Sequence, residues 1–246
     1  MDSLPEAVRA WIAEAQHVAV LTGAGMSAES GVPTFRDAQT GLWAQFDPQD
    51  LATEAAFRAH PQRVWDWYAH RREALKAVSP NAGHIALAAF AQRHPGRLTV
   101  ITQNVDGLHQ RAGSGEAIAL HGNITEQRWL DVPRGCCDAN RIELGHPPRC
   151  GVCGNLRRPA VVWFGESLPQ DALESAEAAA RICDLMLVVG TSGVVYPAAG
   201  LALTAHQLGA RVVIVNPECT DIDPIADVLL REPAAQCLPF LLMDPP

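Results

Sequence analysis

Short apolar runs alternate along the chain with longer, alanine-rich segments of helical spacing. The runs are rich in β-branched residues and apolar on both faces, which is typical of buried parallel strands. Strands are therefore predicted over residues 17–21, 98–101, 185–189 and 212–215, and helices over residues 81–92, 170–181 and 198–208. This alternation predicts an α/β fold with a doubly wound parallel sheet.

Two stretches interrupt the alternation, and both read as insertions. Residues 40–79 have helical spacing, whereas residues 123–159 are irregular, Pro-rich and contain a cluster of cysteines. A chain of 246 residues is long enough for one large core with a smaller appended module. We therefore expect a large domain from residues 1–39, 80–122 and 160–246, and a small helical and Cys-containing domain from the two insertions.

Composition narrows the class of protein. Hydrophobic residues make up 48% of the chain and charged residues 19%, which is the balance of a globular enzyme. A net charge of -8 leaves no basic patch to displace counterions from phosphates, so no nucleic-acid partner is expected. No stretch of about 18 consecutive apolar residues occurs, so no membrane partner is expected.

The cysteines indicate a reducing compartment. Their number, seven, is odd, and Cys183, Cys219 and Cys237 lie far apart in or beside apolar segments. Buried free thiols explain these three best, so a cytoplasmic location is expected.

The first predicted strand runs into a glycine-rich loop. The stretch Gly23-Ala24-Gly25-Met26-Ser27-Ala28 fits a dinucleotide-binding pattern with alanine in the third small position. Glycines there let backbone N–H groups approach a pyrophosphate. A pair of glycines after a strand also fits a simple tight turn. The polar stretch 29–37 follows in place of a second strand, and it suggests a lid over a nucleotide. With this loop, the predicted sheet is Rossmann-like.

Polar side chains also end three later apolar runs. Ligands of open α/β sheets bind at the carboxyl ends of strands, although the same residue types also cap helices and make Asx-turns. The candidates are Gln103, Asn104 and Asp106 after one run, Gly190, Thr191 and Ser192 after the next, and Asn216 after the last. His121 follows a further apolar segment, where an imidazole is either structural or a base near neutral pH.

Taken in order, these segments resemble the sirtuin family over nearly the whole chain. The resemblance rests on residues 23–37, 80–84, 103–106, 121–122, 161–166, 190–192 and 216. It implies an NAD-dependent protein-lysine deacylase that yields nicotinamide, O-acyl-ADP-ribose and free lysine. By the same resemblance His121 is the catalytic base, and the NAD-binding residues are Gly23, Ala24, Gly25, Ser27, Phe35, Arg36, Gln103, Asn104, Asp106, Gly190, Thr191, Ser192 and Asn216.

Two other functions share parts of this pattern. A mono-ADP-ribosyltransferase would cleave NAD in the same way but pass the sugar to a protein nucleophile. A non-catalytic sensor of NAD or acyl peptides would keep the pocket without using the base, and the presence of His121 speaks against it.

The metal site departs from the family. Sirtuins usually hold a structural zinc with two Cys-x-x-Cys pairs, and Cys150 and Cys153 match the second pair. Trp129 stands where the first pair should begin, and the later Cys136-Cys137 is adjacent, a spacing that suits a tetrahedral ion poorly. Zinc is therefore an open expectation, with Cys136 or Cys137 and His146 as further candidate ligands.

The acyl-binding residues are expected in both insertions. Tyr68 and Arg71 are three apart in a helical pattern, so a phenol and a guanidinium share one face and together form a carboxylate receptor. The alternative, which is the more usual one for an arbitrary helix, is that Arg71 forms a surface ion pair and Tyr68 is half-buried in ordinary packing. The segment also resembles the sirtuin subgroup that removes succinyl, malonyl and glutaryl groups, and in that comparison Ala52 is the small pocket residue.

The extended run 161–164 offers further candidate substrate contacts, at Val161, Trp163 and Phe164. Such a run can pair with a substrate backbone as an added strand, or it can be an ordinary core strand.

Overall fold

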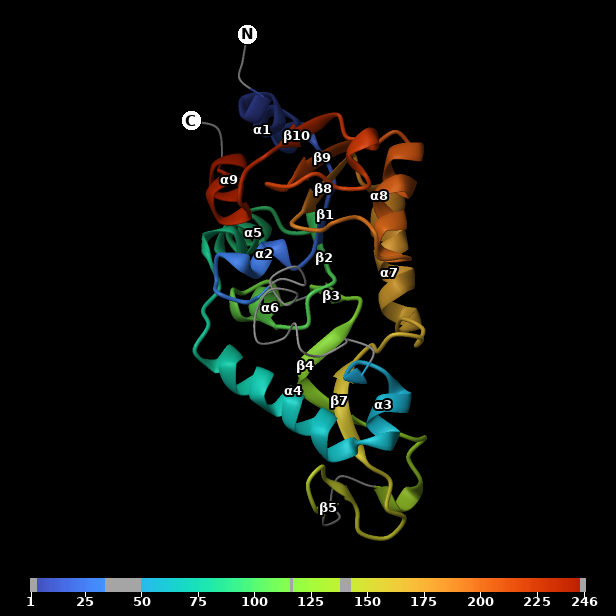
Figure 1. Ribbon diagram of the computed structural model, residues 1–246. Coiled ribbons are helices and arrows are strands. Elements are labelled where there is room, and N and C mark those ends of the chain that lie inside the picture. The colour runs from blue at the N-terminus through green and yellow to red at the C-terminus, as the bar shows by residue number, and fades with distance from the viewer. Residues whose placement is uncertain (1–3, 34–49, 116, 138–142, 244–246) are drawn as a thin grey trace.

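The computed structural model describes residues 4–33, 50–115, 117–137 and 143–243. Its upper part is a six-stranded sheet in the order β10-β9-β8-β1-β2-β3, and every neighbouring pair is parallel (Figure 1). The strands are β1 (Val18–Thr22), β2 (Leu98–Thr102), β3 (Ile118–Ala119), β8 (Leu185–Val189), β9 (Arg211–Val215) and β10 (Val228–Leu230). The four predicted strands are confirmed to within one residue at each end, whereas β3 and β10 are too short to have shown a periodic pattern.

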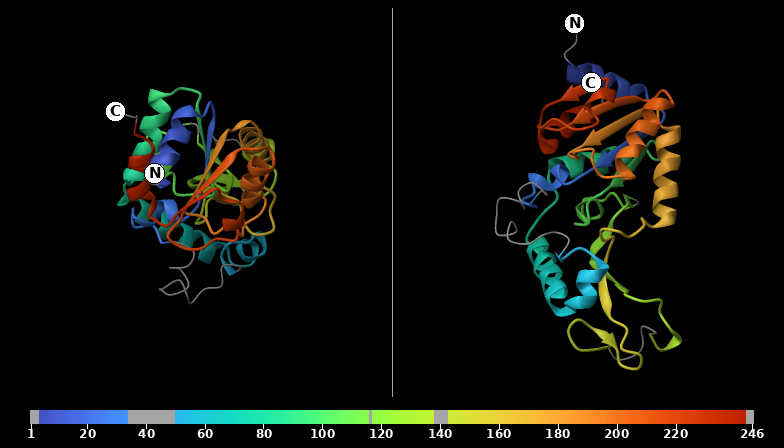
Figure 2. Two further views of the ribbon diagram at one scale, coloured as in Figure 1. Left: turned by 90° about the horizontal axis from the view of Figure 1, so that it is seen from above. Right: turned by 45° about the vertical axis from the view of Figure 1, so that its right-hand side comes forward.

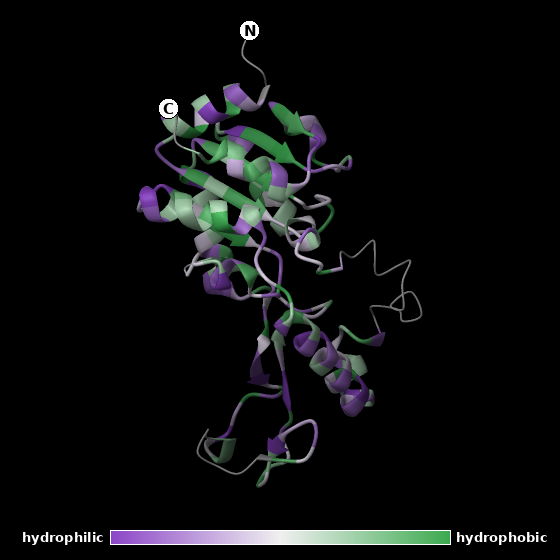
Figure 3. Ribbon diagram, turned by 90° about the vertical axis from the view of Figure 1, so that its left-hand side faces the viewer, coloured by the Kyte–Doolittle hydropathy of each residue, from purple (hydrophilic) through white to green (hydrophobic). Residues whose placement is uncertain are grey.

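Helices cover both faces of this sheet (Figure 2). Along β1, Val18 and Val20 join one apolar cluster while Ala19 and Leu21 join the other, because successive side chains of a strand point to opposite faces. The first cluster includes residues of α1 (Leu4–Glu14), α2 (Gly25–Ala28), α5 (Ala82–Arg93) and α9 (Ala234–Leu241). The second includes residues of α7 (Gln170–Ile182) and α8 (Ala198–Gln207). Figure 3 shows the strands between them as predominantly hydrophobic. The predicted doubly wound sheet is confirmed.

A second region lies below the sheet. There β4 (Gly122–Trp129) pairs antiparallel with β7 (Arg157–Val161), beside α3 (Glu54–Ala59) and α4 (Pro61–Lys76) (Figure 1). The hairpin of β5 (Glu143–Leu144) and β6 (Arg149–Cys150) lies at its far end with the 3-10 turn Gly135–Cys137. Two further short elements, α6 (Leu108–Arg111) and the 3-10 turn Asp223–Ile225, belong to the loops of the sheet.

The prediction that residues 123–159 are irregular is wrong at both ends, where β4 and β7 form a ladder. The sequence could not show β4, because its side chains are mostly exposed and carry no apolar alternation. A separate apolar cluster joins this ladder to α3 and α4, and includes Phe57, Tyr68 and Trp163. The division into a large and a small domain at the residues given above stays a prediction. Within the described residues, no helix is long and apolar enough to cross a bilayer.

Candidate functional site

The carboxyl ends of the central strands meet at Thr191. Gln103, which follows β2, donates its side-chain amide to the Thr191 hydroxyl over 3.0 Å. Asn216, which follows β9, donates to the Thr191 carbonyl over 2.9 Å. The loop after β8 is therefore tied to both of its neighbours, and candidates far apart in sequence line one edge of the sheet.

The glycine-rich loop after β1 packs against the loop after β8. The Gly25 amide donates to the Gly190 carbonyl over 2.8 Å, and a Cβ on Gly25 would lie 2.7 Å from the Gly190 Cα. Gly190 itself has a φ of +62°, a conformation that favours glycine. Ala24, between the two glycines of the first loop, is exposed. Close packing of two backbones therefore explains the glycines, and it leaves the crest of the loop open to a ligand.

Ser27, Asn104 and Asp106 form a buried hydrogen-bonded group behind that loop. Ser27 donates its hydroxyl to the Asp106 carboxylate over 2.7 Å and accepts from the Asn104 amide over 3.1 Å. Asn104 also donates to the Gly23 carbonyl, and Asp106 accepts from the Leu108 amide. Asp106 is 6% exposed, and the two donors satisfy its buried carboxylate.

Two buried histidines in contact with this group were missed among the predicted site residues. His84 lies 3.4 Å from the Ser27 hydroxyl, and its ring centre is 4.8 Å from that of His109 with the two rings tilted by 57°. His109 contacts the Thr22 hydroxyl. Burial lowers the pKa of His84 to about 4 and that of His109 to about 3. The usable signal was Asn81, which caps α5 and forms a capping box with His84.

His121 is positioned as a base. Its Nδ1 lies 2.9 Å from the Gln103 carbonyl oxygen, which can only accept, so Nδ1 carries the proton and Nε2 keeps its lone pair. Burial lowers the pKa of His121 below its ordinary value, although the bond to Gln103 opposes the shift. The imidazole is therefore neutral near pH 7. The backbone carbonyl of His121 accepts a hydrogen bond from the Val162 amide over 2.9 Å, which joins the sheet edge to the end of β7.

Tyr68 and Arg71 lie on α4 in the second region, about one helical turn apart. Tyr68 is 3% exposed, and its oxygen accepts a hydrogen bond from the Trp163 indole N–H over 3.0 Å. Burial raises the pKa of the phenol, which is therefore protonated. The Arg71 guanidinium lies 4.6 Å from the centre of the Trp67 ring, and within the part of the chain that is described no carboxylate pairs with it. Among the described residues, Arg71 therefore lacks the partner that a surface ion pair would need.

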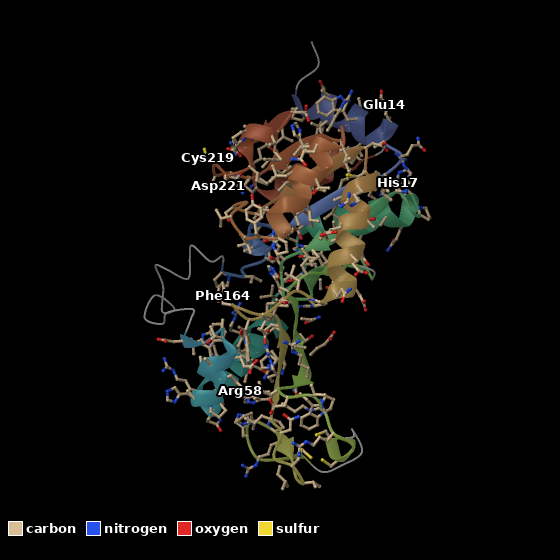
Figure 4. All side chains as sticks on the ribbon, turned by 90° about the vertical axis from the view of Figure 1, so that its right-hand side faces the viewer. Glu14, His17, Arg58, Phe164, Cys219 and Asp221 are labelled. Carbon is tan, nitrogen blue, oxygen red and sulfur yellow. The ribbon has the colours of Figure 1, made fainter. Side chains whose placement is uncertain are left out.

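The run 161–164 is mainly a core segment. Val161 and Trp163 are buried in the cluster with Tyr68, whereas Phe164 is 54% exposed. Figure 4 shows Phe164 between the sheet and the second region, and its amide donates to the Ala52 carbonyl over 2.9 Å. The backbones of Ala52 and Phe164 are thus joined.

The expectation of an added substrate strand on this run needs correction. The amides of Val162 and Phe164 donate to carbonyls of this chain, and the Trp163 amide donates to the Glu166 carboxylate over 2.8 Å. These three N–H groups are occupied, so they are not free to pair with a substrate backbone. Phe35 and Arg36 lie outside the described residues.

The four clustered cysteines meet at the far end of the second region. The sulfur atoms of Cys136, Cys137, Cys150 and Cys153 all lie within 4.8 Å of one another. Four thiolates about 2.3 Å from a tetrahedral zinc are roughly 3.8 Å apart, so the cluster fits this ion. The expectation that adjacent Cys136 and Cys137 suit one ion poorly is wrong, because the 3-10 turn brings both to the β6 end. His146 instead pairs with Asp66 over 2.9 Å.

Known proteins share both this fold and this set of segments. Residues 23–197 match the Sir2 family. A relative from Ralstonia nicotianae, named NAD-dependent protein deacylase, is 58% identical over 240 residues, covering 97% of this chain and 96% of that protein. One of the same name from Deinococcus radiodurans is 50% identical, covering 96% and 97%. The solved structure of a Sir2 homologue in complex with NAD superposes with a TM-score of 0.86 at 43% identity, covering 98% and 93%.

A glycine-rich loop and a polar edge at the carboxyl ends of a doubly wound sheet are typical of nucleotide-binding proteins, and the relatives of this chain are NAD-dependent deacylases. The chain belongs to the Sir2 family.

Proposed function

We propose that this NAD-dependent protein deacylase removes succinyl and malonyl groups, as well as acetyl groups, from protein lysines. The observation that carries the proposal is the pairing of Tyr68 and Arg71. A buried, protonated phenol and a guanidinium without a carboxylate partner in the described residues stand on one face of α4. Two such donors fit a carboxylate at the end of an acyl chain.

Ala52 and Phe164 would border the same acyl chain. A small residue at position 52 leaves room for a four-carbon chain, and the exposed phenyl ring of Phe164 provides an apolar surface beside it. An acetyl group needs neither the room nor the two donors. Arg71 and Tyr68 therefore act on the choice of acyl group rather than on the reaction itself.

The sheet edge would hold NAD. We infer that Gly23, Ala24 and Gly25 face the pyrophosphate, and that Thr191, Ser192 and Asn216 lie near the adenosine. Gln103, Asn104 and Asp106 would then position the nicotinamide and its ribose. When bound, NAD supplies an electrophilic sugar carbon with nicotinamide as its leaving group. The hydrogen bonds described above hold these side chains in place before a ligand arrives, which limits the entropy lost on binding.

His121 would take a proton from a ribose hydroxyl at its Nε2 atom. The Gln103 carbonyl holds the imidazole in the tautomer that this step needs, and burial keeps it neutral at pH 7. The resulting products are nicotinamide, O-acyl-ADP-ribose and free lysine. We also propose a cytoplasmic location, on the argument from the odd number and wide spacing of the cysteines.

Nicotinamide release separates this function from its two rivals. The purified protein is incubated with NAD and one peptide whose lysine is succinylated, acetylated or unmodified. A deacylase releases nicotinamide only with an acylated peptide, and this one should accept the succinylated form. Release without any acyl group, with ADP-ribose attached to protein, would indicate a transferase. Binding of NAD without release would indicate a sensor.

A further inference from the structure

Trp163 contacts Tyr68, one of the two residues of the proposed carboxylate receptor. It lies 95 residues from Tyr68 in the sequence, and its indole N–H donates to the phenol oxygen over 3.0 Å. The indole is 2% exposed, so the bond is shielded from water. A phenol that accepts this bond still has its own O–H to donate, and within the described residues no acceptor takes it.

The indole is held in place on several sides. Its ring lies 3.3 Å below the Arg158 guanidinium carbon, and the Phe57 ring is 5.3 Å away. The backbone amide of Trp163 donates to Glu166, which also accepts from Arg158 over 3.0 Å. Arg158 is 1% exposed and donates as well to the Val161 carbonyl. The indole N–H therefore has little freedom to turn away from the phenol.

The bond also keeps Arg71 available. A guanidinium three residues along a helix from a phenol shares its face and can donate to the phenol oxygen. That oxygen already accepts the indole N–H, whose partial positive charge disfavours the cationic guanidinium as a further donor to the same atom. Arg71 and the phenol O–H thus remain two separate donors, which is the arrangement that a carboxylate requires.

We propose that Trp163 is a specificity-positioning residue, whose indole N–H orients the Tyr68 hydroxyl toward the carboxylate of a dicarboxylic acyl group. This inference rests on the proposed function above. An acetyl group has no carboxylate, so the indole N–H contributes nothing to its turnover. If Trp163 were only a packing residue, its loss would lower both activities by the same factor.

Trp163→Phe tests the proposal, because it keeps an aromatic ring and removes the N–H. The measurement is kcat/KM for succinyl-lysine and acetyl-lysine in one peptide. We expect about a fivefold loss with the succinyl peptide, mostly in KM, as for one buried hydrogen bond, and less than about a twofold change with the acetyl peptide. Should the variant fold poorly, β-(3-benzothienyl)alanine at position 163 keeps the bicyclic shape and replaces the N–H with sulfur.

A double-mutant cycle with Tyr68→Phe separates positioning from packing. Without the phenol oxygen, Trp163→Phe should no longer change the ratio of the two activities. Phe57→Leu is the matched control, since it alters packing on the same indole and leaves the N–H in place; it should leave the ratio unchanged. Equal losses with both peptides, or effects of Trp163→Phe and Tyr68→Phe that simply multiply, would overturn the proposal.

These outcomes are distinct from failure of the proposed function. A wild-type enzyme that ignores succinyl-lysine would refute the carboxylate receptor and this inference together. If wild type desuccinylates and loss of Arg71 impairs it, while Trp163→Phe keeps the wild-type ratio, only the role of Trp163 falls.

Discussion

The sheet edge and the second region hold their functional groups by different means. At the sheet edge, backbones pack directly on each other, as at Gly25 and Gly190, and short polar side chains are tied by hydrogen bonds. In the second region, long side chains such as Arg71 and Trp163 lie in or beside a small core and make aromatic and cation–π contacts. The first arrangement leaves little room for substitution, whereas under the proposed function a single side chain of the second region would alter the choice of acyl group.

The two regions also differ in what supports them. The sheet has apolar clusters on both faces, each contributed by several helices. The second region has one smaller cluster, and the described part of its far end consists of short strands, a 3-10 turn and the four cysteines. A small module with little core is commonly stabilised by a metal. The sheet edge therefore depends on packing, and the far end of the second region on its thiolates.

The largest effect should follow from loss of the zinc ion that the four cysteines fit. We expect about one zinc ion per chain in protein purified without chelator, since structural zinc sites contribute on the order of 10 kcal/mol. Cys150→Ala should lose the ion and unfold the far end at a lower temperature, while Cys219→Ser, outside the cluster, should keep both. Metal analysis and thermal unfolding measure this. Full activity and stability with no metal would show that the far end folds unaided.

The next largest effect concerns the base. His121→Ala should lower kcat at least a thousandfold, about 4 kcal/mol, with succinyl and acetyl peptides alike, because the imidazole acts on the ribose. NAD affinity, measured by calorimetry, should stay near the wild-type value, since the base contributes little to ground-state binding. Substantial turnover of any acyl peptide would remove His121 from this role.

Gly25→Ala tests the close packing of the glycine-rich loop on the loop after β8. Its Cβ would meet the Gly190 Cα at 2.7 Å, which forces two backbones apart and should destabilise the protein by about 3 kcal/mol. NAD affinity should fall as well. Gly115→Ala is the control, because a Cβ there meets nothing within 4 Å. Unfolding in urea compares the two, and equal stabilities would contradict the rigid loop.

Acid should lower the stability of the protein through the two buried histidines, His84 and His109. An unfolded chain protonates them below about pH 6.5, whereas the folded chain does so only near pH 4 for His84 and pH 3 for His109. Their folded pKa values are depressed, so this stability is present above pH 6.5 and is lost as the pH falls toward 4. As the pH falls from 7 to 5, each histidine should lower the free energy of unfolding by about 2 kcal/mol.

Urea unfolding across that pH range measures the effect. His109→Gln should flatten the dependence, and His206→Gln, at the exposed end of α8, should leave it unchanged. A slope that is the same in all three proteins would mean that other groups cause it.

The sequence predicted the sheet better than the second region, for a physical reason. Strands such as β8 are buried on both faces, so their sequences are continuous apolar runs. The exposed strand β4 leaves no such record, and the meeting of Cys136 and Cys137 with Cys150 depends on a turn and a hairpin rather than on spacing. Contacts between residues far apart in the sequence place β4 and assemble the cysteine cluster, so neither can be predicted from a local pattern.

The same contrast holds for the candidate residues. Those at strand ends share one edge because parallel strands end together, so Gln103, Thr191 and Asn216 could be predicted. The bond between Trp163 and Tyr68 joins segments 95 residues apart, and no local pattern reports it. Trp163 was accordingly expected to contact substrate, whereas the structure buries it against Tyr68.

The carboxylate receptor is tested most directly by Arg71→Met. This change keeps the length and apolar stem of the side chain and removes the charged donor. We expect kcat/KM with a succinyl-lysine peptide to fall at least tenfold, because a charged hydrogen bond contributes about 1.5–3 kcal/mol, while kcat/KM with the matching acetyl-lysine peptide changes much less. Equal loss of both activities, or a wild-type enzyme indifferent to succinyl-lysine, would contradict the receptor and leave a plain deacetylase.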